Sequence, residues 1–104
     1  FSFKPHFWVR EEKDSNSEVD LVYHYRQYII PIEIKSGKQG KLRSLHQFIE
    51  RTSHPYAVRI SAAEFKVEEV KTPAGVPYLL MNMPYYLGTK IPEYIEYFVE
   101  NHSL

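Results

Sequence analysis

The chain has 104 residues, a formal net charge of zero and no cysteine. This length predicts one domain over residues 1–104, and the lack of cysteine excludes disulfides and thiolate zinc sites. The balanced charge excludes an overall field that draws the chain onto nucleic acid, so any such binding must come from a local patch. Because no apolar run approaches the ~20 residues that span a bilayer, we expect no membrane contact and a cytoplasmic location.

Two kinds of periodicity follow one another along the chain. Alternating or short apolar runs predict strands over 7–10, 18–25, 28–35, 56–60, 65–70 and 78–83. Apolar residues at helical spacing predict helices over 41–51 and from 91 to the C-terminus, where Pro92 stands at the helix start. Turn residues separate these segments at 14–17, 26–27 and 72–75. The order of elements predicts a mixed α/β domain.

The predicted strands over 18–25 and 28–35 are expected to form a hairpin closed by Arg26 and Gln27. In this register the numbers of two opposed residues add up to 53. Asp20 is therefore expected to face Glu33, and Glu18 to face Lys35. All four side chains are predicted on one face of the sheet. The opposite face of the first strand is expected to carry Val19, Leu21, Tyr23 and Tyr25.

This register brings two carboxylates together beside a lysine. Adjacent carboxylates repel each other unless one is protonated or a cation lies between them. Oxygen ligands suit Mg²⁺, Mn²⁺ or Ca²⁺, and Lys35 could reach a metal-bound water or a phosphoryl oxygen. The alternative is a solvated sheet face, in which Glu18 and Lys35 form a surface pair of little energy. The apolar run around Glu33 argues against that alternative, because charges on an interior strand need a reason.

The segments 18–22 (EVDLV) and 30–37 (IPIEIKSG) resemble the active-site hairpin of the PD-(D/E)xK nuclease superfamily. More narrowly, the chain resembles the domain of unknown function 4143, which follows an AAA+ ATPase module in many prokaryotic proteins. The likeness runs from about Phe7 to Leu87. It implies a restriction-endonuclease-like mixed sheet with flanking helices, and a C-terminal fragment of a larger ATPase that lacks the superfamily's first helix.

The resemblance also implies roles for residues of the hairpin. Asp20 and Glu33 would be metal ligands with the carbonyl of Ile34, and Lys35 would orient water or stabilise charge in the transition state. Glu18 would be auxiliary. The implied cofactor is Mg²⁺ or Mn²⁺, while ATP would bind only in the upstream module.

A basic segment follows the hairpin. Lys38, Lys41 and Arg43 lie in a stretch without acidic residues from 36 to 49, and Gln47 matches a glutamine that some superfamily members carry on this helix. These four residues are candidates for nucleic-acid binding, and a solvated loop is an equally good interpretation.

The leading hypothesis is a metal-dependent nuclease domain that hydrolyses phosphodiesters of DNA or RNA. The main alternative is a non-catalytic module of the same fold, which binds nucleic acid or a protein partner for the ATPase. A third hypothesis, a structural domain with a solvated charged face, predicts that divalent metal leaves its stability unchanged. The expected partners are nucleic acid and the upstream ATPase module, with oligomerisation through the parent protein.

Overall fold

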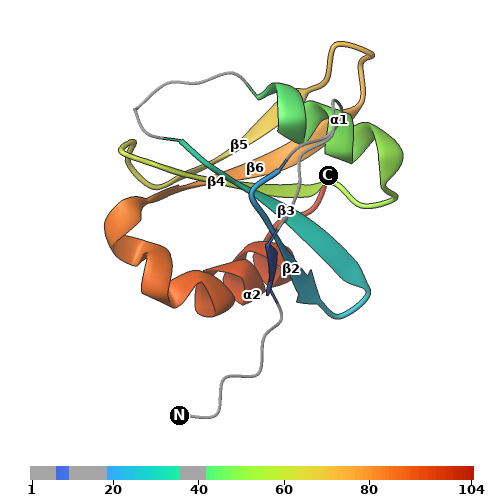
Figure 1. The fold of residues 1–104 in the computed structure, drawn as a ribbon. Coiled ribbons are helices and arrows are strands. Elements are labelled where there is room, and N and C mark those ends of the chain that lie inside the picture. The colour runs from blue at the N-terminus through green and yellow to red at the C-terminus, as the bar shows by residue number, and fades with distance from the viewer. Residues whose placement is uncertain (1–6, 10–18, 36–41) are drawn as a thin grey trace.

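The computed structural model describes residues 7–9, 19–35 and 42–104, which form a mixed α/β domain (Figure 1). A sheet in the order β1-β2-β3-β4-β6-β5 lies between α1 on one face and α2 on the other. The strands are β1 (Phe7–Val9), β2 (Leu21–Tyr25), β3 (Tyr28–Ile34), β4 (Tyr56–Ser61), β5 (Lys66–Lys71) and β6 (Pro77–Pro84). The helices are α1 (Arg43–Arg51), the 3-10 helix η1 (Tyr85–Lys90) and α2 (Ile91–Asn101).

The predicted hairpin is confirmed in its register. Leu21 pairs with Ile32 and Tyr25 with Tyr28, so opposed residues sum to 53. Arg26 opens the two-residue turn at φ 56°, the left-handed backbone that tight hairpin turns require at this position. The turn therefore closes without Gly or Asn, and its two residues set the register of the β2–β3 pair.

The second half of the sheet is joined to the hairpin through parallel strands. β3 pairs with β4 in parallel, and β4 pairs with β6 in parallel. The helix α1 makes the crossover between β3 and β4, as a parallel pair demands. β5 pairs with β6 antiparallel at the edge, where the turn before β6 uses Gly75 at φ 90°. As a result, β3, β4 and β6 are interior strands.

Two apolar clusters hold the helices to opposite faces of the sheet. The α2 side is centred on Ile32, Val58, Met81, Ile95 and Phe98, which are buried. The α1 side is built from Val19, Leu45, Ile49, Ala57, Tyr78 and Leu80. Burying a side chain of the larger apolar types contributes about 1.5–3 kcal/mol, so each helix is fixed mainly by its apolar stripe.

The predicted face of Val19 is wrong. Leu21, Tyr23 and Tyr25 pack on the α2 side as expected, but Val19 packs on the α1 side. The backbone bends at Asp20, just before β2 begins at Leu21. The bend interrupts the two-residue alternation, because strict alternation holds only along a regular strand.

The other predicted elements are found with shifts of one to three residues at their ends, the largest at α2, which ends at Asn101 and not at the C-terminus. The helix predicted over 41–51 begins at Arg43, and the strand predicted over 65–70 spans Lys66–Lys71. The 3-10 helix η1 was not predicted. Within the described ranges, no helix has both the length and the apolar character needed to cross a bilayer.

Candidate metal and nucleic-acid site

The hairpin brings Asp20 to the strand that carries Glu33. The β2–β3 ladder ends at the pair of Leu21 and Ile32, which directly adjoin Asp20 and Glu33 in the sequence. The Asp20 Oδ2 atom accepts a hydrogen bond of 2.8 Å from the backbone N–H of Ile34. That bond holds the Asp20 carboxylate against β3, one residue along from Glu33.

Glu33 is a buried acidic residue in the middle of the sheet. Its side chain belongs to β3, between β2 and β4, and the residue is only 8% exposed. Its Oε2 atom lies 3.0 Å from the Nζ atom of Lys35, and its Oε1 atom is buried. A solvated sheet face does not account for this burial, because a carboxylate leaves water only where a partner compensates it.

Lys35 follows directly after β3 and keeps its backbone tied to the sheet. Its N–H donates to the carbonyl of Ile60 on β4 over 2.8 Å. The side chain stays partly solvated, with 26% of its surface exposed. The ammonium can therefore neutralise Glu33 and still meet an anion that arrives from solvent.

The described residues contain no group of three histidine or acidic side chains that could hold a metal ion. They supply two carboxylates, Asp20 and Glu33, and the predicted third ligand is the carbonyl of Ile34. Glu18 lies outside the described residues. Carboxylate and carbonyl oxygens match the preference of Mg²⁺ and Mn²⁺, which retain several waters in such sites. The donor set thus fits a hydrated divalent cation.

Of the nucleic-acid candidates, Lys38 and Lys41 lie outside the described residues. Arg43 is the first residue of α1, and Gln47 follows one turn later. Both line a hollow of about 790 Å³ between α1 and the turn at Pro73. Arg43 is exposed, but Glu50 lines the same hollow, so the described part of this patch is not uniformly basic.

Two histidines near α1 have structural roles. His54 Nε2 lies 2.7 Å from the carbonyl oxygen of Ile29, and its Nδ1 accepts the N–H of Tyr56 at 3.1 Å. Burial lowers the pKa of His54. The buried hydroxyl of Tyr78 lies 3.0 Å from His46 Nδ1, and burial raises the pKa of Tyr78 to about 12. These contacts join α1 and its following loop to the sheet.

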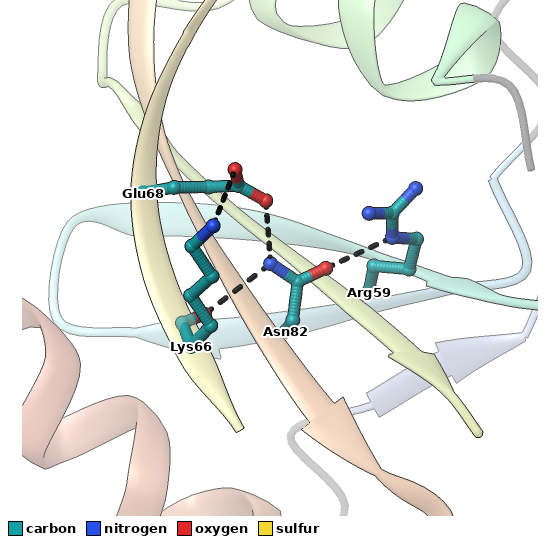
Figure 2. Close-up of polar contacts among 4 residues, drawn as sticks. All are labelled: Arg59, Lys66, Glu68 and Asn82. Atoms are coloured by element: carbon teal, nitrogen blue, oxygen red, sulfur yellow. Dashed lines mark hydrogen bonds and ion pairs between the residues drawn. The ribbon is translucent and has the colours of Figure 1, made fainter. Parts of the chain in front are cut away.

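Sequence reasoning missed a polar group on the neighbouring strands. Arg59 on β4 and Asn82 on β6 are neighbours in register, and Arg59 also lies beside Glu33. Arg59 Nε donates to Asn82 Oδ1 over 3.0 Å, and Asn82 Nδ2 donates to Glu68 Oε2 over 2.8 Å (Figure 2). Arg59 and Asn82 each lie in an apolar strand, which is the same signal that singled out Glu33. The sequence did not reveal that these two strands are adjacent.

A comparison with known families identifies the chain. Residues 1–79 match the model of the domain of unknown function DUF4143. The chain belongs to this family. The match includes the whole hairpin, α1 and most of the sheet. No curated protein and no solved structure matches the chain.

Proposed function

We propose that this DUF4143 domain is a metal-dependent nuclease of the PD-(D/E)xK type, which hydrolyses phosphodiesters of DNA or RNA. The observation that carries the proposal is the buried Glu33 in an interior strand, with the Lys35 ammonium 3.0 Å away. The Asp20 carboxylate lies against the same strand, where it accepts the N–H of Ile34. We also propose that the domain follows an AAA+ ATPase module in a larger protein and has a restriction-endonuclease-like fold.

Each of the three side chains would have its own role in the reaction. Asp20 and Glu33 would hold the cation, with help from the carbonyl of Ile34. A bound Mg²⁺ or Mn²⁺ would supply Lewis acidity toward a phosphoryl oxygen and lower the pKa of a bound water. Lys35 would bind a non-bridging phosphoryl oxygen and offset the charge that accumulates in the transition state.

Before metal binds, both carboxylates of this site have partners within the chain. Lys35 offsets the charge of Glu33, and Asp20 is held by the Ile34 N–H. Two carboxylates near each other favour cation uptake. Since Lys35 is two residues from Glu33 and partly exposed, it can turn toward a substrate phosphate once a cation replaces it.

One observation favours a second candidate function, a non-catalytic module that binds nucleic acid or a protein partner. Glu33 already has a cationic partner in Lys35, 3.0 Å away. The described residues also hold no group of three acidic or histidine side chains that could bind a metal ion. A domain that had lost catalysis could keep this pair for its structure alone. This candidate predicts no metal-dependent cleavage by the full-length protein.

Titration calorimetry with Mn²⁺ and Mg²⁺ tests the metal site. We expect saturable binding to the wild-type chain and none to the Asp20→Asn/Glu33→Gln variant. The matched control is Glu93→Gln/Glu96→Gln, which removes two carboxylates from α2 on the other face and should bind as the wild type does.

Cleavage of DNA and RNA by the full-length protein, with Mn²⁺ and with EDTA, then separates the two candidates. Metal-dependent cleavage that disappears in Lys35→Met would support the nuclease. Metal binding without cleavage of either polymer would favour the non-catalytic module, and no metal binding at all would reject the site.

A further inference from the structure

The open hollow of about 790 Å³ between α1 and the turn before β6 is built like a small-molecule site. Its volume lies in the range of such sites, which combine mainly apolar walls with a few polar groups. Leu42, Pro73 and Ala74 form an apolar wall. The rest of the lining comes from longer side chains of α1, namely Arg43, His46, Gln47 and Glu50.

Three of these side chains form a row with charges at its two ends. Arg43, His46 and Glu50 follow one another at spacings of three and four residues, which place them on one face of the helix. Arg43 and Glu50 are exposed, and within the described part of the chain neither forms an ion pair. They are about 10.5 Å apart along the helix axis, so both charges remain available to a ligand.

His46 presents a hydrogen-bond donor between these two charges. Its Nδ1 atom lies 3.0 Å from the hydroxyl of Tyr78, a fully buried residue. If Nδ1 held the ring proton, the buried hydroxyl proton would have no acceptor among the described residues, so the hydroxyl donates and Nδ1 accepts. Burial lowers the pKa of His46 against the opposing charge of Glu50. The ring is therefore neutral at pH 7 and carries its proton on Nε2, the nitrogen on the side away from Tyr78.

These groups complement the parts of an adenine nucleotide. The planar guanidinium of Arg43 suits a phosphate, and the apolar wall suits the faces of a base. The edge of adenine presents a ring-nitrogen acceptor beside an amino donor, which match the Nε2–H of His46 and the carboxylate of Glu50. Guanine presents two acceptors on that edge, and the second would meet the Glu50 carboxylate unfavourably.

We propose that this hollow binds an adenine nucleotide, with its phosphate on Arg43 and the edge of its base between His46 and Glu50. The nucleotide is either free or an unpaired adenosine of a nucleic-acid strand, because both carry the same groups. The site contains no residue of the hairpin. The proposal therefore goes beyond the proposed nuclease function and stands whether or not the hairpin binds metal.

A titration of the isotopically labelled chain with adenosine monophosphate (AMP) in EDTA, followed by the amide signals in NMR spectra, tests the site. We expect saturable shifts in α1 and in the turn at 72–76. Adenosine lacks the phosphate and should bind about tenfold more weakly, the effect of losing one hydrogen bond between charged groups. Guanosine monophosphate (GMP) should also bind at least about tenfold more weakly than AMP.

Two substitutions of exposed residues separate the phosphate contact from the base contact. Arg43→Gln should weaken AMP about tenfold and leave adenosine unchanged. Glu50→Gln should remove the preference for AMP over GMP, because an amide can donate to a base as well as accept from it. The matched control is Arg51→Gln, which removes an exposed cation of α1 outside the hollow and should bind AMP as the wild type does.

Three results would overturn the inference. They are no saturable shift in α1 at up to about 1 mM AMP, equal binding of AMP and GMP, and an Arg43→Gln effect no larger than that of Arg51→Gln. A single-stranded oligoadenylate then identifies the source of the nucleotide: tighter binding than AMP assigns the hollow to a strand, and weaker binding assigns it to the free nucleotide. Because EDTA removes the metal, failure of the hairpin as a metal site leaves this assay unaffected.

Discussion

Replacing Lys35 by Met should destabilise the fold because it leaves a buried carboxylate without its ammonium. Glu33 Oε2 and Lys35 Nζ are 3.0 Å apart, and only 11% of the Glu33 side chain is exposed. At this distance and an effective dielectric constant of about 20, the attraction is about 5 kcal/mol. Desolvation offsets much of it, and breaking a fully buried pair costs about 3–5 kcal/mol. Since Lys35 is partly solvated, we expect a loss of about 1–3 kcal/mol.

The double variant Glu33→Met/Lys35→Met identifies the source of that loss. Apolar residues of similar volume often match or exceed the stability of a buried ion pair. We therefore expect the double variant to regain the wild-type free energy of unfolding or to exceed it. The residues would then be retained for function at the expense of stability.

Urea titrations at neutral pH, with and without Mn²⁺, measure the free energy of unfolding of the wild type, the single variant and the double variant. Mn²⁺ at about 100 times its Kd should add about 2.7 kcal/mol to any chain that binds it only when folded. Lys35→Met should gain this increment, because a cation can replace the ammonium, whereas the double variant should gain none. A Lys35→Met loss below about 0.5 kcal/mol, the range of ordinary surface substitutions, would refute the buried-charge argument. A double variant no more stable than the single one would assign the loss to packing of the lysine stem.

Three further predictions concern the scaffold. Phe98→Ala should lower the free energy of unfolding by about 3–5 kcal/mol in urea titrations, because Phe98 is fully buried and packs edge-on against Tyr56. Gly75→Ala should cost about 1 kcal/mol by the same assay; since a Cβ meets nothing within 4 Å, the loss reflects only the φ of 90°. Burial lowers the pKa of His54 when folded, so the unfolded chain takes up a proton first as the pH falls below about 6.5. Stability should then fall by at most about 1.4 kcal/mol per pH unit from this group until the folded pKa is reached. His54→Gln should flatten that slope in thermal melts between pH 7 and pH 5, and an unchanged slope would contradict the assignment.

The unpredicted contacts that Asn82 makes with Arg59 and Glu68 show why single-sequence reasoning finds some site residues and not others. Asp20 and Glu33 belong to one hairpin, whose two-residue turn sets the register locally and brings Asp20 to the strand that carries Glu33. Arg59 and Asn82 are 23 residues apart and meet only through the parallel pairing of β4 and β6. Each gives a polar signal in an apolar strand, but nothing nearby in the sequence specifies the neighbour.

The sequence alone determined the order of the strands and of the two α-helices, and the hairpin register, because these depend on local periodicity and turn length. Only the tertiary structure decided the order of strands in the sheet, the burial of Glu33 between β2 and β4, and the side on which Val19 packs. These features depend on how the crossover through α1 places β4 beside β3, and on a bend at Asp20 that breaks the alternation. Long-range packing selects such arrangements, so residue spacing cannot specify them.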